Sequence, residues 1–161
     1  MKSKQQRAGA PGEKRAPVSI DNRRARYEYE VLESLEAGLV LTGTEIKSIR
    51  AGGVSLSEAY ARFRDGEAWL LGMHVPAYRQ GSFSNVDPNR PRKLLLHREQ
   101  IVRLQSRVGE KGLTIVPLRM YFTRGIAKVQ LGLARGKKLW DKRAVVAKRD
   151  VEREIARRVR K

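Results

Sequence analysis

The sequence predicts a mainly β fold with helices, in which a small antiparallel barrel or sandwich forms the body of a single domain. At least five short segments alternate apolar and polar residues and are joined by hairpin connections rather than by helical crossovers. Two segments among them have the apolar spacing of helices. The length of 161 residues is enough for one domain with a substantial core.

The two ends of the chain differ in composition from the middle. Residues 1–20 are rich in Lys, Arg, Gly and Pro and have almost no large apolar side chains, so burial cannot offset the entropy lost on ordering. We predict a flexible basic N-terminal arm there and a folded domain over residues 21–133. Residues 134–161 form a basic C-terminal tail with 12 Lys and Arg against 4 Asp and Glu.

The first elements of the domain are strands around one helix. Residues 27–41 alternate and then contain Gly38 within an apolar run, which predicts a long strand bent or bulged at that glycine. EIKSIR, which is followed by Ala and two glycines, predicts a short helix. Residues 57–64 and 67–74 are predicted to form a hairpin, because the Asp65-Gly66 dipeptide accepts the positive φ angles of a tight turn.

The second half of the domain contains a loop, a helix and another hairpin. Prolines and Asn or Asp residues mark residues 83–93 as a loop. The apolar spacing in residues 94–108 predicts a helix that Gly109 closes. Residues 113–124 and 126–133 alternate on either side of a glycine and are predicted to be strands.

The tail carries one narrow apolar stripe along an otherwise charged segment. The stripe consists of Ala144, Ala147, Val151, Ile155 and Val159. Isolated helices of this length are marginal in water. We therefore predict that the tail is disordered alone and helical when bound to a partner.

The charge of the chain indicates its partner. A formal net charge of +18 would cause strong self-repulsion unless an anionic partner neutralised it, and nucleic acid is the first candidate. Attraction to anionic lipid is a minor alternative. The chain has no cysteine, which excludes disulfides and thiolate metal sites and fits a reducing cytosol. It starts without an apolar leader and lacks a long apolar run, so we expect a soluble cytoplasmic protein without membrane contact.

The sequence gives no sign of catalytic chemistry. It contains no phosphate-binding loop, no dinucleotide-binding glycine motif, and no metalloprotease or serine hydrolase motif. Two lone histidines, His74 and His97, make a poor metal set without cysteines, so we expect no metal and no other cofactor. The acidic residues form no evident acid/base pair. We predict a protein that is not an enzyme.

Aromatic residues are interpreted by their surroundings. Trp69 and most other aromatics fall in predicted strands, where packing in a core or half-core is the simplest explanation. Tyr29 and Tyr60 are also placed to stack or hydrogen-bond on an RNA face. Trp140 differs, because its basic flanks offer no core and a ring among cations suits base stacking beside phosphate contacts.

Four motifs, in this order, closely resemble the SsrA-binding protein family, small protein B. They are NRRARYEYEV, EAGLVLTGTEIKSIRAGG, DPNRPRKLLLHR and GLARGKKLWDKR, and the similarity extends over residues 21–161. The resemblance implies an oval β-barrel resembling the oligonucleotide-binding fold, with helices outside it. It further implies a monomeric adaptor that binds the tRNA-like domain of transfer-messenger RNA and delivers it to stalled ribosomes for trans-translation, with elongation factor Tu as an indirect partner.

The resemblance also implies two sets of binding residues. The RNA-binding set is Asn22, Arg24, Arg26, Tyr29, Glu36, Lys47, Tyr60, Lys93, Leu95 and His97. The ribosome-binding set, expected to enter the messenger channel and decoding centre of the small subunit, is Arg135, Gly136, Lys137, Lys138, Trp140, Asp141, Lys142 and Arg143. An acid in an RNA site accepts hydrogen bonds from a base amino group or ribose hydroxyl, which cations cannot do.

Two alternatives remain. A structural ribosomal protein or general RNA chaperone would share the basic tails and the barrel, but it would bind all ribosomes in constant stoichiometry. An RNA-cleaving enzyme would show metal-dependent turnover of RNA.

Overall fold

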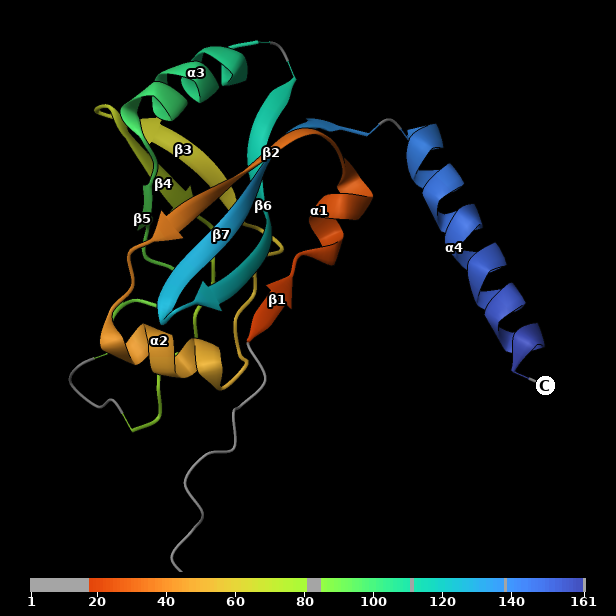
Figure 1. Cartoon of the computed structure of the whole chain (residues 1–161), viewed down its shortest axis with the longest axis horizontal. Helices are drawn as coiled ribbons and strands as arrows, with labels where there is room; N and C mark the ends of the chain where they lie inside the picture. The colour runs from red at the N-terminus through yellow and green to blue at the C-terminus, as the bar shows by residue number, and fades with distance from the viewer. Residues whose placement is uncertain (1–17, 81–84, 111, 138, 161) are drawn as a thin grey trace, which may run out of the picture.

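The computed structural model describes residues 18–80, 85–110, 112–137 and 139–160. Seven antiparallel strands form one sheet in the order β1-β6-β7-β2-β5-β4-β3, and four helices lie outside it (Figure 1). The elements are β1 (Ser19–Asp21), α1 (Arg23–Glu28), β2 (Tyr29–Leu39), α2 (Gly43–Arg50), β3 (Tyr60–Arg64), β4 (Glu67–Leu71), β5 (Arg92–Leu95), α3 (Arg98–Val108), β6 (Leu113–Thr123), β7 (Ile126–Gly136) and α4 (Leu139–Val159). The predicted class, mainly β with helices, is confirmed.

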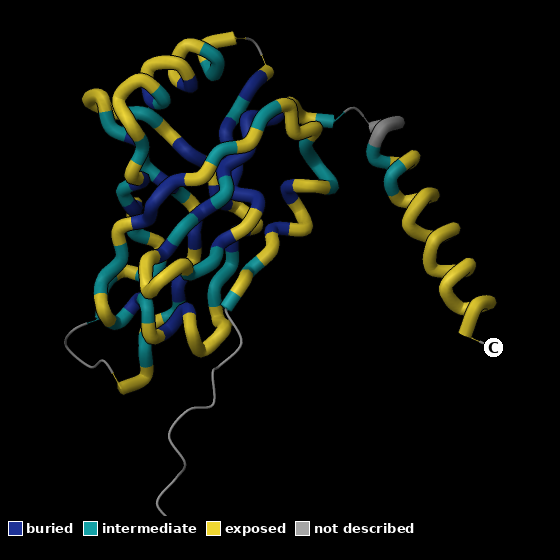
Figure 2. The backbone as a smooth tube through the Cα atoms, in the orientation of Figure 1, coloured by how far each residue is buried: buried dark blue, intermediate teal, exposed yellow. Residues whose placement is uncertain are grey.

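The sheet curls towards a barrel without closing. β3 and β6 contact each other across the molecule, but the ladders between described strands leave β1 and β3 as the two edges. The inner face of the curl holds the core, which Figure 2 shows as buried segments along the strands. The core includes Ala37, Leu39, Ile49, Leu70, Leu94, Leu104, Ile115, Met120, Val129 and Leu131. The alternation that predicted the strands therefore separates this core from a polar outer face.

Two hairpins form where the sequence predicts them. Asp65 and Gly66 have φ angles of 52° and 75°, and Arg124 and Gly125 have φ angles of 50° and 77°. Positive φ at both central residues matches the right-handed twist of the flanking strands. Each turn leads directly into a ladder, with Arg64 opposite Glu67 in the first hairpin.

The start of the domain differs from the prediction. Residues 27 and 28 belong to α1 rather than to the long strand, and β1 uses Ser19 and Ile20, which were predicted to belong to the arm. The side chain of Asn22 accepts a hydrogen bond from the backbone N–H of Ala25 and thereby caps α1. A helix of six residues is too short to show apolar periodicity.

The bulge in β2 is also placed differently. The register shifts between Val31 and Glu33, near the start of the strand, so the prediction of a bulge at Gly38 is wrong. Gly38 instead pairs with Lys128 of β7 on one side and Leu95 of β5 on the other. A Cβ at Gly38 would lie 3.1 Å from the Cβ of Leu95, so the glycine permits this close approach.

β5 and the helix after it divide the segment that was predicted as one helix. Residues 94 and 95 are strand, and α3 begins at Arg98. β7 continues through Arg135 and Gly136, beyond the predicted end of the domain at residue 133. α4 extends away from the body and contacts α1, with its apolar stripe largely exposed (Figures 1 and 2).

A buried charge network fixes α2 to β5. Arg92 is fully buried and Glu45 is 3% exposed, and the nitrogen Nη2 of Arg92 lies 2.8 Å from Oε1 of Glu45. Arg90 donates to both oxygens of the same carboxylate, at 2.9 and 2.6 Å. Arg92 also donates to the carbonyls of Met73 and Pro88. One carboxylate therefore holds α2, β5 and the segment before β5 together.

Candidate RNA interface

The outer face of the central strands brings together three residues of the expected RNA-binding set. In the ladders, Leu95 of β5 lies opposite Gly38 of β2. Glu36 is two residues N-terminal to this glycine in β2, so both lie on the same face of the sheet. Lys93 precedes Leu95 by two residues and faces the same way. Leu95 is 53% exposed, unusual for a leucine in the middle of a sheet. The result is an apolar spot with a carboxylate and an ammonium group beside it.

Glu36 is held in its ionised form by its neighbours. It accepts a hydrogen bond from the hydroxyl of Tyr121, and Lys128 Nζ lies 3.4 Å from Oε1. The hydrogen bond from Tyr121 is the main reason that the pKa of Glu36 lies below its ordinary value, and Lys128 adds to it. The same hydrogen bond raises the pKa of Tyr121. Glu36 therefore presents a fixed acceptor on an otherwise basic surface.

Further residues surround Glu36 that were not among the expected contacts. Ser34, Arg119, Tyr121 and Gln130 line a shallow hollow with Glu36, and Lys128 pairs with Glu36 at its edge. The alternation of residues 126–133 already placed Lys128 and Gln130 on the polar side of a strand. The sequence alone does not reveal that β2 pairs with β7, and this pairing brings Lys128 and Gln130 next to Glu36.

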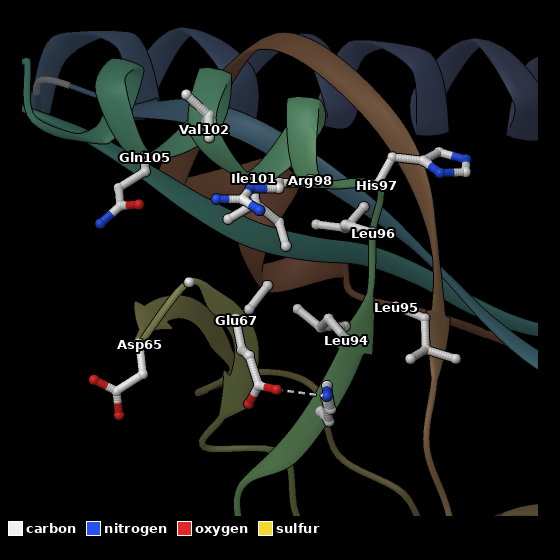
Figure 3. A pocket seen from close by; sticks show the side chains of 13 residues that line it. Asp65, Glu67, Leu94, Leu95, Leu96, His97, Arg98, Ile101, Val102 and Gln105 are labelled. Atoms are coloured by element: carbon white, nitrogen blue, oxygen red, sulfur yellow. Dashed lines mark hydrogen bonds and ion pairs between the residues drawn. The ribbon is translucent and has the colours of Figure 1, made fainter.

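A hollow between β5 and α3 adjoins this surface. Figure 3 shows Leu94 from β5 and Ile101 from α3 reaching into the hollow, while Glu67 forms the ion pair with Lys93 at 2.7 Å. The ring of His97 extends away from the hollow at the start of α3. The exposed His97 therefore lies at the rim rather than in the floor.

A second group of expected residues lies between α1 and β3. Arg24, Tyr29 and Tyr60 line one pocket together with residues of β6. Arg24 pairs with Glu28 at 3.0 Å and also with Glu58, so its guanidinium is oriented over the pocket. Arg26 is exposed at the end of α1. The α1 end of the barrel thus offers two phenol rings and two guanidinium groups to a partner.

Asn22 lines the same pocket but is almost fully buried. It is only 4% exposed. Its side-chain amide donates hydrogen bonds to the carbonyls of Leu56 and Pro117, at 3.0 and 2.8 Å. Asn22 therefore caps and anchors α1, which carries the arginines.

Substituting Asn22 by alanine is expected to destabilise the fold by about 1–3 kcal/mol, since two buried carbonyls lose their donor. Thermal unfolding of the purified variant measures this. An unchanged melting temperature would contradict the anchoring role of the Asn22 side chain.

Lys47 is separated from both groups. It is exposed on α2, at the opposite end of the barrel from α3 (Figure 1), and its ammonium lies 5.7 Å from the centre of the Tyr78 ring. This distance suits a cation–π contact. Lys47 lies in a helix, so the strand pairing that aligns Glu36, Lys93 and Leu95 does not place it beside them.

The expected ribosome-binding run begins at a fixed point on the body. Arg135 and Gly136 are the last residues of β7, and among the described residues nothing beyond the chain neighbours of Gly136 comes within 4 Å of a Cβ built on it. The Lys137 backbone N–H donates to the Glu28 carbonyl at 2.8 Å, and its ammonium donates to the Arg26 carbonyl at 3.1 Å. The tail therefore leaves the barrel at the C-terminal end of α1.

The rest of this run lies in or beside α4. Lys142 is half-buried and Arg143 is exposed. The predictions for Lys138 and for the side chains of Trp140 and Asp141 lie outside the described part of the structure. The backbone of residues 140 and 141 is helical.

The described residues form neither a cluster of metal-ligating side chains nor a helix that could span a membrane. Nowhere among them do three or more His, Asp or Glu side chains gather as a metal site would require. The ring nitrogen Nδ1 of His74 lies 2.8 Å from Oδ1 of Asn89, so this histidine has an amide and not a metal-ligating side chain as its neighbour. The described helices are each too short or too polar to cross a lipid bilayer.

Known proteins resemble this chain over most of its length. A family model described as SmpB protein matches residues 19–161. An SsrA-binding protein of Desulforudis audaxviator is 58% identical over 139 residues, which are 86% of this chain and 91% of the relative. An SsrA-binding protein of Salinispora tropica is 55% identical over 147 residues, 91% of this chain and 92% of the relative. A chain in a solved structure described as "tmRNA-SmpB: a journey to the center of the bacterial ribosome" is 55% identical with a TM-score of 0.65, covering 76% of this chain and 86% of that one.

Proposed function

Because this chain belongs to the SmpB protein family, we propose that it is an RNA-binding adaptor that binds the tRNA-like domain of transfer-messenger RNA and delivers it to stalled ribosomes for trans-translation. The observation that carries the proposal is the family match over residues 19–161, which includes both the curled sheet and the tail. Relatives at more than half identity are SsrA-binding proteins.

The outer face of the sheet has the chemistry that a folded RNA requires. Lys93 and Lys128 supply positive charge for phosphates, and exposed Leu95 supplies an apolar surface for a base or ribose. Glu36 accepts from base amino groups or 2′-hydroxyls, so it adds selectivity that plain cationic attraction lacks. We therefore assign recognition of the transfer-messenger RNA to this face together with Arg24, Arg26, Tyr29 and Tyr60.

We assign contact with the ribosome to the tail. Arg135, Lys137, Lys138, Lys142 and Arg143 meet phosphates of the small-subunit RNA, Trp140 stacks on a base, and Asp141 belongs to the same contact. The tail orders fully on this partner, so it binds weakly alone and well when the barrel holds it near its target.

Several finer features belong to the same proposal. The protein acts as a monomer in the cytoplasm, where ribosomes are. It catalyses no reaction of its own, and elongation factor Tu joins through the RNA rather than through this chain. Asn22 and Lys47 remain outside the recognition face, the first as a positioning residue and the second as a separate cation on α2.

The proposal is tested by sequencing the RNA that co-purifies with the affinity-tagged full chain from bacterial cells. Transfer-messenger RNA is expected to be the most enriched transcript over total RNA, with ribosomal RNA enriched only when ribosomes stall. Ribosomal RNA in constant stoichiometry on all ribosomes would identify a structural ribosomal protein instead. Turnover of RNA by the pure protein would identify an enzyme.

The Glu36→Arg variant, purified in parallel, separates recognition from charge. Its enrichment of transfer-messenger RNA is expected to fall about tenfold although it adds positive charge, because the acceptor is lost. Glu110→Arg makes the same charge change just beyond α3 and is expected to keep the enrichment. Tighter binding by Glu36→Arg would reduce the face to non-specific electrostatics.

A further inference from the structure

We propose that Trp69, flanked by Arg62, forms a stacking site for an unpaired nucleotide of the bound RNA. The site lies on the β3–β4 hairpin, at the edge of the sheet, and extends the recognition face beyond Lys93. The inference rests on the proposed function, since it takes the same RNA as its ligand.

The ladders place the three side chains in one row across the sheet. Arg62 of β3 is the register partner of Trp69 of β4, and Trp69 is the register partner of Lys93 of β5. Register partners have their side chains on the same face, about 5 Å apart at the Cβ atoms. Leu95 lies in the adjacent row on the same face, and Tyr60 precedes Arg62 by two residues. The site is therefore continuous with residues already assigned to RNA recognition.

The Trp69 ring is not needed to fill the core. Its chain neighbours Ala68 and Leu70 are fully buried on the inner face, whereas Trp69 is only half-buried on the outer face. There it lines an open hollow with Arg62, Arg64, Leu71 and Pro91, among others. A large flat ring that borders an open hollow has a free face on which a base can stack.

The charges around the ring favour a polyanion. Arg62 is exposed, and no acidic partner within ion-pair distance is found for it among the described residues. Arg64 lies 3.7 Å from Asp65 with both side chains more than four-fifths exposed, which makes the pair weak. The carboxylate of Glu67 is held by Lys93. A nucleotide on Trp69 would thus find one free guanidinium and one weakly held guanidinium for its phosphates.

The occupant is an unpaired nucleotide rather than a duplex. β3 pairs only with β4 among the described strands, so the hairpin forms an edge where a flexible strand can approach. A paired base has both faces covered by its neighbours, whereas an unstacked base is free to stack on an aromatic ring.

Trp69 fluorescence reports the stack directly. The Trp140→Phe chain has one tryptophan, Trp69, and is titrated with a transcript of the tRNA-like domain while RNA binding is followed separately by anisotropy of labelled RNA. Quenching of Trp69 that saturates together with the anisotropy is expected. Saturating anisotropy without a change in Trp69 emission overturns this inference and leaves the proposed function standing. No saturable binding of the transcript would count against the proposed function itself.

Affinity measurements on the full chain with Trp140 intact complete the test. Trp69→Leu keeps a smaller apolar side chain but loses the ring, and is expected to weaken binding about 5- to 100-fold, while Trp69→Phe stays within about threefold of the unmodified chain. Arg62→Ala is expected to lower the magnitude of the salt slope by about 1. Arg107→Ala, a matched charge loss in the last turn of α3, is expected to leave the slope unchanged. The proposed stacking site is refuted if Trp69→Leu and the unmodified chain bind the RNA with equal affinity while both proteins unfold cooperatively.

Discussion

Replacing Asp141, Lys142 and Arg143 together with alanine is expected to abolish peptide tagging on stalled ribosomes while RNA affinity stays within about twofold. These residues lie in the first turns of α4, which contacts the body at α1, whereas Glu36, Lys93 and Leu95 lie on the outer face of β2 and β5. The change removes from the tail two cations that we propose bind phosphates, and an acid that stabilises a helix N-terminus. In vitro translation of a message without a stop codon, read out as tagged product, measures the effect.

A matched variant separates position from charge. Alanine at Lys148, Arg149 and Asp150 also removes two cations and one acid from α4, one to two turns later. It is expected to keep most of the tagging activity. A collapse of RNA affinity in the first variant would mean that the body and the tail do not divide the work, and equal tagging by both variants would mean that only total charge matters.

Replacing Glu45 with glutamine is expected to destabilise the fold by about 3–5 kcal/mol at neutral pH, because it leaves Arg92 buried without its counter-charge. Glutamine has almost the same shape, so packing changes little. The carboxylate accepts from Arg90, from Arg92 and from the Thr42 backbone N–H at 2.9 Å, and glutamine cannot accept from all of them. Urea unfolding of the two proteins measures the difference.

The effect of this substitution depends on pH in a defined direction. Burial alone would raise the pKa of Glu45, but hydrogen bonds from Arg90 and the Thr42 backbone, with the charge of Arg92, hold the pKa below its ordinary value of 4.5. The carboxylate thus stabilises the fold fully above pH 4.5, and this contribution is lost as the pH falls through the lowered pKa.

Comparing the two proteins over this range isolates Glu45. The gap in unfolding free energy between the unmodified chain and Glu45→Gln is expected to narrow on acidification, because a protonated Glu45 resembles glutamine. General charge repulsion in acid acts on both proteins and cancels. Glu99→Gln, an exposed site in the first turn of α3, serves as the control and should show a gap of no more than about 0.3–1 kcal/mol, as for any acid near a helix N-terminus. A constant gap for Glu45→Gln would rule out the charge of Glu45 as its cause.

Much of the fold could be predicted because local patterns agree with the final structure. The alternation in residues 113–133 and the dipeptide Asp65-Gly66 both specify hairpins without knowledge of distant partners. The same local logic fails for Arg92, since a single arginine beside Lys93 gives no sign of which side chain turns inward. Only the pairing of β5 with β2 and β4 decides that Arg92 joins the core side with Leu94 while Lys93 faces outward.

The candidate interface was predicted unevenly for the same reason. Motif resemblance pointed to Glu36, Lys93 and Leu95, and the sheet does bring these three together. It also pointed to Asn22, whose side chain is occupied by two carbonyls from segments distant in sequence. Tyr121 was missed because its contact with Glu36 depends on β6 lying next to β7, and no spacing within either strand reveals it.

The two hydrogen bonds of Lys137 decide where the tail starts. They hold Lys137, which follows β7, to backbone carbonyls of Arg26 and Glu28 in the last turn of α1. The other end of α1 is held to the carbonyl of Pro117 in β6 through Asn22. The helix that carries Arg24 and Arg26 and the starting point of the tail therefore share one attachment site on the body.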